Sequence, residues 1–293
     1  MLRACIDIGS NTTRLLVADV ADGSLREVLQ QRAYTRLRGR DEVPPERLAA
    51  IADAVATQVR LARECGCVHL RVVGTAALRD TPNRDELVAA IRATTGVDVE
   101  ILSGDDEAKL AFAGATRTLS HLPLGEVGVV DVGGGSTELV TGTLADGVSW
   151  SASFRVGSGF LAESYLRTDP PSAAELQKVR HHVAGVFEGL DAPRPPVAYA
   201  VGGSAGSLRR LVGSVLDPDS LERGLRVLSA APAADVARRF ELEEERVRLL
   251  PAGMLILEEA SRLLGAPLRI GRGGLREGVV LSDVASADAG RAA

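Results

Sequence analysis

Two short segments of the chain repeat one pattern whose residue types could hold a phosphate group. Residues 3–18 read RACIDIGSNTTRLLVA, and residues 127–142 read VGVVDVGGGSTELVTG. Each segment is an apolar run that leads into Asp-apolar-Gly, a small polar turn and a second apolar run. Runs of this kind favour strands, and turns of this kind favour hairpins. We therefore predict two strand–turn–strand units, with Asp7 and Asp131 at the mouths of the turns.

The two turns suit phosphate for specific chemical reasons. Glycine lets the backbone approach an anion closely, and consecutive N–H groups then form a nest for phosphate oxygens. A carboxylate repels phosphate, so Asp7 and Asp131 would instead hold Mg²⁺ or a water, with the cation bridging to the phosphate. The predicted phosphate-binding residues of the turns are Ser10, Asn11, Thr12, Gly133, Gly134, Gly135, Ser136 and Thr137.

Other glycine-rich phosphate sites fit the second turn less well. A dinucleotide-binding turn needs a helix after the glycines, whereas the residues from Glu138 favour a strand, and the Gly-Lys-Ser/Thr ending of a Walker A loop is absent. Two ordinary hairpin turns are the simpler alternative. The repetition of the pattern, each time with an aspartate, argues against it.

Alternating strands and helices occupy the rest of the chain, which indicates an α/β protein. The expected strands are 70–74, 97–102, 197–201 and 268–270. The expected helices are 45–64, 84–94, 103–119, 171–190, 208–215, 231–240, 251–264 and one from Leu275. A third glycine turn, 202–207, precedes a helix, so Gly203 and Ser204 are candidates for anion binding at a helix N-terminus.

The segment 121–125 is the expected linker between two domains. We predict a first domain over 1–122 and a second over 123–285, with the option that the final helix packs back on the first domain, and a disordered tail over 286–293. One of the two predicted strand–turn–strand units lies at the start of each half. This arrangement resembles the actin-like superfamily of sugar kinases and Hsp70 (ribonuclease H-like domains), in which two related domains face each other across a cleft.

Composition argues against several classes of function. The net charge is −5 and aromatic residues make up 3%, which argues against a nucleic-acid partner, because such proteins are usually basic and stack bases on aromatic rings. Three cysteines form no disulfide framework, and the apolar run near the N-terminus is broken by Asp7, so it is no signal peptide. No apolar run reaches about 18 residues. We expect a cytoplasmic protein without a membrane partner.

Further motifs, in order along the chain, resemble the exopolyphosphatase / guanosine pentaphosphate phosphohydrolase (Ppx/GppA) family. Besides the two hairpins, they are GTAALRD at 74–80, LSGDDEA at 102–108, GGSAG at 202–206, LPAG at 250–253 and GLREG at 274–278. The resemblance covers residues 3–283, in a short two-domain form of the family.

This resemblance implies release of terminal orthophosphate from inorganic polyphosphate, or 5′-phosphate removal from pppGpp. It implies that Glu107 deprotonates the attacking water, that Arg79 clamps phosphate oxygens, and that Asp131 and Glu138, with Asp7, hold Mg²⁺ or another divalent cation. It also suggests a homodimer. From the residues alone, Glu107 could equally be an acid that favours a helix N-terminus.

Three departures from the family pattern bear on substrate choice. Arg38 stands where glycine is usual, Arg248 replaces an aspartate and Ala252 follows Pro251 where glycine is usual. The chain ends after the two core domains, which mildly favours short polyphosphate.

Two alternative functions from other classes are an actin-like phosphotransferase acting on an acceptor and a non-catalytic regulator that binds polyphosphate or an alarmone. The four histidines fit no site pattern.

Overall fold

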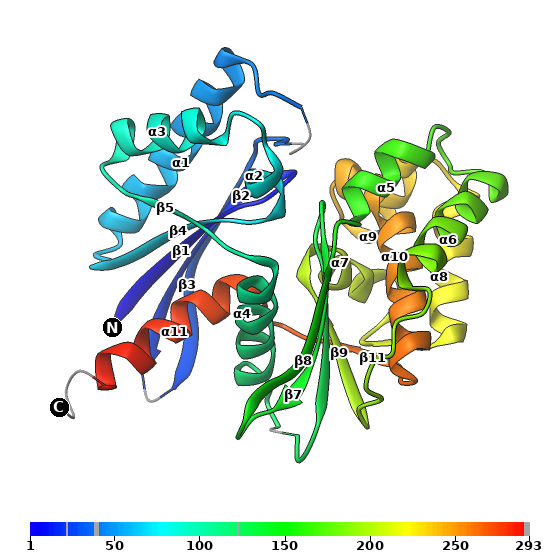
Figure 1. The fold of residues 1–293 in the computed structure, drawn as a ribbon. Coiled ribbons are helices and arrows are strands. Elements are labelled where there is room, and N and C mark those ends of the chain that lie inside the picture. The colour runs from blue at the N-terminus through cyan, green and yellow to red at the C-terminus, as the bar shows by residue number, and fades with distance from the viewer. Residues whose placement is uncertain (22, 38–40, 122, 290–293) are drawn as a thin grey trace. The chain divides into compact units, whose positions relative to one another are not determined.

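The computed structural model describes residues 1–21, 23–37, 41–121 and 123–289, with side chains described as far as residue 282. The chain forms two compact units. Unit 1 is Met1–Thr118 together with the chain from Gly273, and unit 2 is Leu119–Arg272. Figure 1 shows that each unit has its own sheet. The C-terminal helix therefore belongs to the same unit as the N-terminus, and the second unit ends before residue 273 rather than at residue 285.

The strands of unit 1 form one five-stranded sheet in the order β3-β2-β1-β4-β5. Their bounds are β1 Leu2–Ile8, β2 Thr12–Ala21, β3 Ser24–Tyr34, β4 His69–Gly74 and β5 Val99–Ile101. Strands β1, β4 and β5 run parallel, and β2 and β3 continue the sheet as antiparallel strands. Strand β1 is buried at most positions because helices cover both faces of the sheet.

The helices of unit 1 fill those two layers. Their bounds are α1 Pro45–Glu64, α2 Ala76–Asp80, α3 Arg84–Thr95, α4 Gly104–Arg117 and α11 Leu275–Ala289. One face of β1 presents Ile6 and Ile8 to a core that includes Ile51 and Val55 of α1. The opposite face presents Cys5 to a core with Val279 and Val280 of α11. Successive residues of a strand point to opposite faces, which is why Asp7 lies on the α11 side of the sheet.

Helices α4 and α11 touch backbone to backbone. A Cβ atom on Gly114 would lie 1.9 Å from the Gly274 carbonyl oxygen, and one on Gly278 would lie 1.9 Å from the Leu110 carbonyl oxygen. Any side chain at these glycines would push the helices apart. The LREG segment at the start of α11 therefore fixes the position of α4, the helix that carries Glu107.

The strands of unit 2 repeat the order of unit 1 with one strand added. The six-stranded sheet has the order β10-β11-β9-β6-β7-β8. The bounds are β6 Val127–Val132, β7 Thr137–Thr143, β8 Gly147–Phe154, β9 Val197–Val201, β10 Val215–Leu216 and β11 Leu268–Ile270. Strands β6, β9 and β11 are parallel, and β7 and β8 are antiparallel additions. The predicted α/β class with two actin-like domains is confirmed.

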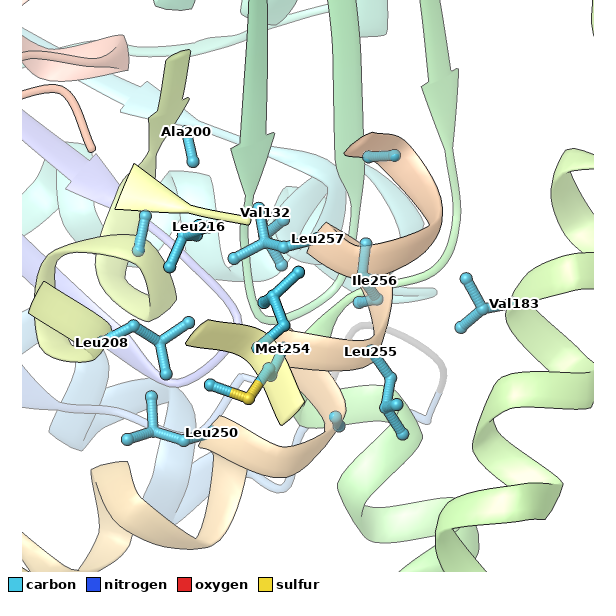
Figure 2. Close-up of a cluster of buried hydrophobic side chains, with 14 of the residues drawn as sticks. Val132, Val183, Ala200, Leu208, Leu216, Leu250, Met254, Leu255, Ile256 and Leu257 are labelled. Carbon is cyan, nitrogen blue, oxygen red and sulfur yellow. The ribbon is translucent and has the colours of Figure 1, made fainter. Parts of the chain in front are cut away.

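A long helix organises the core of unit 2. The helices are α5 Ser158–Tyr165, α6 Ala173–Phe187, α7 Gly202–Val212, α8 Pro218–Ala230, α9 Ala233–Phe240 and α10 Glu244–Leu264. Figure 2 shows Met254, Leu255 and Leu257 of α10 surrounded by side chains from β6, α6 and α7. Figure 1 shows α5, α6, α8, α9 and α10 grouped on one side of the sheet.

Three expected helix bounds are wrong. Helix α10 begins at Glu244 and continues through Pro251, because buried apolar residues on both sides of the proline hold it in the core. Helix α7 begins at Gly202, so the third glycine turn is the first turn of the helix itself. Helix α11 runs to Ala289, where a disordered tail was expected from residue 286; residues 290–293 lie outside the described part. No helix among the described residues is both long and apolar enough to span a membrane.

Candidate functional site

The first predicted turn closes β1 and β2 around Gly9, Ser10 and Asn11. The Gly9 N–H donates to the Thr12 carbonyl oxygen at 3.1 Å, and a Cβ atom on Gly9 would lie 3.2 Å from that oxygen. The Asn11 carbonyl oxygen accepts the N–H groups of Thr35 and Arg36, both at 3.0 Å. The backbone is thus fixed from outside the hairpin, and Ser10 and Asn11 are only partly buried.

The second predicted turn has the same internal geometry. The Gly133 N–H donates to the Ser136 carbonyl oxygen at 3.0 Å, and a Cβ atom on Gly133 would again lie 3.2 Å from that oxygen. The internal repeat seen in the sequence is therefore a repeat of backbone structure. Gly134 and Gly135 stay partly exposed, so their N–H groups suit a phosphate nest, whereas Ser136 is 6% exposed.

The start of α5 supports this second turn, and the sequence analysis missed it. The Gly134 carbonyl oxygen accepts the N–H groups of Gly159 and Phe160 at 3.0 Å, and Ser158 donates its N–H to Gly133. A Cβ atom on Gly157 would lie 2.5 Å from the Gly134 carbonyl carbon. The signal was the Gly-Ser-Gly run at 157–159 between a strand and a helix.

The hydroxyl of Thr137 forms a hydrogen bond within the fold. Thr137 is fully buried, and its hydroxyl donates to the Val156 carbonyl oxygen at 2.6 Å. A hydroxyl has one proton to donate, so Thr137 stabilises the turn instead of offering a donor to a ligand. Thr12 is also buried, and its hydroxyl accepts from Arg14 Nε at 3.2 Å.

The charged partners of the two aspartates differ. Asp7 lies directly opposite Arg14 in the β1–β2 ladder, and Asp131 lies directly opposite Glu138 in the β6–β7 ladder. Like charges facing each other across a ladder are destabilising unless something lies between or near them. Glu138 is 4% exposed and accepts from Ser153 Oγ at 3.1 Å. The carboxylate pair therefore occurs in unit 2 only, at the mouth of the glycine-rich turn.

Asp131 and Glu138 fit a magnesium site by their chemistry. Mg²⁺ is usually bound by one or two carboxylates together with substrate phosphates and waters. Within the part of the chain that is described, no three His, Cys, Asp or Glu side chains gather to form a metal site by themselves. A magnesium ion on the Asp131–Glu138 pair would thus complete its shell from phosphate and water.

Asp7 has a different environment. Its Oδ1 atom is buried and has no hydrogen-bond partner among the described residues. Burial raises the pKa of Asp7, and the positive charges of Arg276 and Arg14 oppose this rise. An unsatisfied carboxylate oxygen at the mouth of a phosphate-type turn fits a water or a hydrated cation, so Asp7 stays a predicted metal residue.

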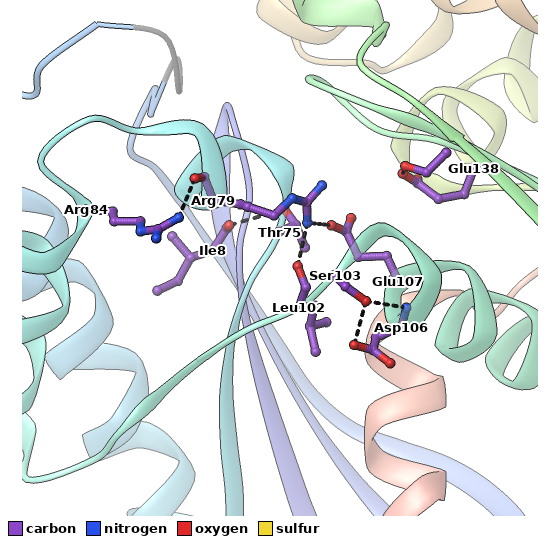
Figure 3. A network of polar contacts seen from close by, with 10 residues as sticks. Ile8, Thr75, Arg79, Arg84, Leu102, Ser103, Asp106, Glu107 and Glu138 are labelled. Atoms are coloured by element: carbon purple, nitrogen blue, oxygen red, sulfur yellow. Dashed lines mark hydrogen bonds and ion pairs between the residues drawn. The ribbon is translucent and has the colours of Figure 1, made fainter.

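Glu107 and Arg79 form an ion pair in unit 1. Arg79 of α2 places Nη1 2.5 Å from Glu107 Oε1, although 28 residues separate them, and also donates to the Leu102 carbonyl oxygen. Figure 3 shows both contacts at the start of α4. The Glu107 side chain is 5% exposed, whereas Asp105 and Asp106 of the same helical turn are exposed. Glu107 is therefore the acid of this helical turn that is buried against an arginine.

The ends of strands β4 and β5 position the Arg79–Glu107 ion pair. Strand β4 ends at Gly74, whose carbonyl oxygen accepts the Leu102 N–H at 2.9 Å, so the segments after β4 and β5 start side by side. Ser103 then caps α4 by accepting the Asp106 N–H at 3.1 Å. The carboxyl ends of parallel strands are where α/β proteins place their ligand sites.

The third glycine turn lies beside the aspartate of the second hairpin. Gly202 has a φ of 87°, and a Cβ atom there would lie 2.4 Å from Asp131 Oδ1. The N-terminus of α7 therefore approaches Asp131 closely, and Gly203 is only half-buried. Ser204 is 1% exposed, and its hydroxyl faces Gly253 of α10 without a hydrogen-bond partner among the described residues. Ser204 is placed in helix packing and not at the surface of the turn.

Two of the three departures from the family pattern have structural explanations. Arg248 forms ion pairs with Asp169 at 3.0 Å and Glu244 at 2.7 Å. Ala252 is fully buried in α10. Arg38 lies outside the described residues. The Nδ1 atom of His182 shares a hydrogen bond of 2.9 Å with the Tyr165 hydroxyl, and neither residue belongs to a site motif.

Comparison with known proteins identifies the family. The model of the Ppx/GppA phosphatase family matches residues 16–287. The chain is 28% identical to Exopolyphosphatase 1 of Mycobacterium leprae, over 94% of this chain and 87% of that protein. It is 31% identical to Exopolyphosphatase 2 of Mycobacterium tuberculosis, over 89% of this chain and 90% of that protein.

Solved structures give the same result. The crystal structure of the Aquifex aeolicus member of the Ppx/GppA family superposes with a TM-score of 0.82 at 26% identity, covering 98% of each chain. An exopolyphosphatase from Cytophaga hutchinsonii shares the fold with a TM-score of 0.86 at 20% identity, again over 98% of each chain. The chain belongs to the Ppx/GppA phosphatase family.

Proposed function

We propose that this chain hydrolyses the terminal phosphoanhydride bond of inorganic polyphosphate and releases orthophosphate. The observation that carries the proposal is the ion pair between the partly exposed Arg79 and the buried Glu107 at the N-terminus of α4. Relatives named exopolyphosphatases, at 28–31% identity over most of the chain, support polyphosphate as the substrate class.

Glu107 acts in this proposal as the general base. It accepts a proton from a water molecule whose oxygen attacks the terminal phosphorus. The bridging phosphorus–oxygen bond breaks, its electron pair stays on the shortened chain, and orthophosphate leaves. Arg79 balances the charge of Glu107, so that a carboxylate can lie near an anionic phosphate, and its guanidinium offers further donors to phosphate oxygens. Positioning and charge stabilisation dominate phosphoryl transfer.

Unit 2 supplies charge neutralisation in the same proposal. Asp131 and Glu138 would hold Mg²⁺, with Asp7 of unit 1 as a further candidate. A bound divalent cation offsets negative charge on phosphate oxygens. The backbone N–H groups of Gly134, Gly135 and Gly203 and the side chains of Ser10 and Asn11 are the proposed phosphate donors, because they are partly exposed.

The test is phosphate release from short polyphosphate, long polyphosphate and pppGpp, each with Mg²⁺ and with EDTA. We expect metal-dependent release that Glu107→Gln lowers by about 100-fold or more, as for loss of a general base. Asp105→Asn is the matched control, because Asp105 is an exposed acid in the same helical turn. Equal losses in both variants would reject the role of Glu107.

The substrate profile decides the remaining alternatives. Faster release from pppGpp than from either polyphosphate would replace the proposed substrate by the alarmone. Tight binding of polyphosphate without release by the wild type would make the chain a non-catalytic binder. Transfer of phosphate to an added acceptor in place of water would indicate a phosphotransferase.

A further inference from the structure

A cavity of about 570 Å³ lies on unit 2 between α8 and α9, in a region that none of the proposed site residues reaches. Its rim carries Arg223, Arg226 and Arg239. Its floor is aliphatic and consists of Val227, Ala230, Ala231 and Val236. Cavities of roughly 300–1,000 Å³ with apolar walls and a few placed polar groups are typical of small-molecule sites.

Part of this floor is exposed because the core-facing sides of the helices are used elsewhere, whereas Val236 is 3% exposed and belongs to the main core. On α8, Leu221, Leu225 and Leu228 are buried in the main core, whereas Val227 and Ala230 lie on the flank of the helix and are not fully buried. Arg223 lies four residues before Val227, on the same flank. On α8, a charged residue and apolar residues of the cavity therefore share one flank, and α9 adds Val236 and Arg239.

The rim is positively charged after its internal ion pairs are counted. Arg226 pairs with Glu222 at 2.9 Å, and Asp235, which also lines the cavity, pairs with Arg238. The lining itself has three arginines and one aspartate, an excess of two positive charges, in a protein whose net charge is −5. In the described part of the chain, no ion pair occupies Arg223 or Arg239, although Arg223 lies close enough to Asp217 to interact with its charge. The Arg239 guanidinium lies 5.3 Å from the Phe240 ring centre.

We propose that this cavity binds an aliphatic phosphate monoester. A phosphate monoester carries about −1.5 to −2 charge at pH 7, which matches the excess of two positive charges, and guanidinium groups bind phosphate oxygens in a fork. The aliphatic part covers the floor, where no aromatic ring is available to stack on a base. Inorganic polyphosphate would leave this floor exposed to water, so the site is distinct in chemistry from the proposed active site.

Calorimetry on the full chain tests the proposal with octyl phosphate, kept below its micelle concentration. We expect saturable binding of one molecule per chain. Octanol lacks the charge and inorganic phosphate lacks the chain, so each should bind at least about 10-fold more weakly. Binding of either compound as tightly as octyl phosphate would overturn the proposal, and this comparison needs only the wild type.

Variants then locate the site. Arg223→Gln with Arg239→Gln should weaken octyl phosphate binding by about 10-fold or more, because two charge-assisted contacts are lost. Arg262→Gln is the control, since Arg262 is an exposed arginine paired with Glu259 on α10, outside the cavity. Ala230→Trp should also weaken binding by filling the floor. Folding of each variant is checked by its melting temperature.

A separate arm distinguishes this site from the proposed active site. Binding that persists in Arg79→Gln and falls in the double arginine variant supports the α8–α9 cavity. Binding lost in Arg79→Gln and retained in the double variant would assign octyl phosphate to the first site and reject the proposal. Because the measurement follows binding without turnover, it stands even if the proposed hydrolysis fails.

Discussion

The two Asp-Gly hairpins have the same backbone but opposite charge at one position. The position opposite the aspartate is Arg14 in unit 1 and Glu138 in unit 2. In both turns the glycine N–H bonds the carbonyl oxygen three residues on, at 3.1 and 3.0 Å. The duplicated fold therefore offers two phosphate-type turns, one with an arginine opposite its aspartate and the other with a second carboxylate in that place.

Because of this difference, we expect the two turns to differ in their dependence on a metal ion. The positive charge of Arg14 opposes the effect of burial on Asp7 only in part, so we expect the first turn to depend less on a metal ion than the second. Two carboxylates facing each other repel, so the second turn gains most from a divalent cation. The supports differ too: the Thr35–Arg36 segment holds the first turn, and the start of α5 holds the second.

The largest expected effect comes from Glu138→Gln. The substitution removes one of two facing carboxylates and should lower phosphate release by about 100-fold or more, because metal ions contribute several kcal/mol to such reactions. We expect Mg²⁺ to raise the melting temperature of the wild type, and the substitution should abolish that rise. Glu126→Gln, just before the start of β6, is the control and should leave both unchanged. If Mg²⁺ still raised the melting temperature of Glu138→Gln as in the wild type, the proposed difference in metal dependence between the two turns would be wrong.

Gly157→Ala should have the next largest effect. Its Cβ atom would need the space of the Gly134 carbonyl carbon at 2.5 Å, so the second turn must shift. We expect at least about a 10-fold loss of activity, since small displacements of positioning groups are costly, and a loss of roughly 1–3 kcal/mol in the free energy of unfolding. Urea denaturation and phosphate release measure the two.

Gly185→Ala is the matched control for Gly157→Ala. Gly185 lies in α6 with nothing within 4 Å of an added Cβ atom. Alanine there should stabilise unit 2 by roughly 0.5–1 kcal/mol and leave activity intact, because glycine in a helix interior is unfavourable. A loss of activity with Gly185→Ala as well would show that the effect at Gly157 is not specific to the turn.

Arg14→Glu gives the first hairpin the charge pattern of the second and should have a smaller effect. Facing Asp7 with a carboxylate should lower the free energy of unfolding by about 1 kcal/mol, measured with EDTA present. Asp7→Asn in the same chain should restore most of that loss, because the repulsion is removed. The absence of such rescue would show that Arg14 acts through other contacts.

The smallest effect is expected at the far end of the same hairpin. Arg26 pairs with Asp19 at 3.1 Å, and its side chain is 77% exposed. Arg26→Gln should change the free energy of unfolding by less than about 1 kcal/mol, because exposed ion pairs contribute little. A loss of unfolding free energy as large as that of Arg14→Glu would mean that stability is no more sensitive to charge at the mouth of the turn than at the far end of the hairpin.

The sequence determined the local features of this protein. Alternating apolar runs around Asp7-Ile-Gly and Asp131-Val-Gly predicted both hairpins, since strand periodicity and turn chemistry act over a few residues. The strand after Glu138 excluded a dinucleotide turn, and the order of strands and helices gave the α/β class. The buried positions of Ser204 and Thr137 were not predictable, because their burial depends on α10 and on the segment after β8.

Only the tertiary structure decided how distant segments meet. Arg79 reaches Glu107 because β4 and β5 end side by side, a pairing that no local pattern encodes. The return of α11 to unit 1 depends on glycines of α4 and α11 that allow backbone contact, which single glycines in a sequence do not announce. Short-range preferences fix turns and strands, whereas long-range packing selects which of their side chains share a site.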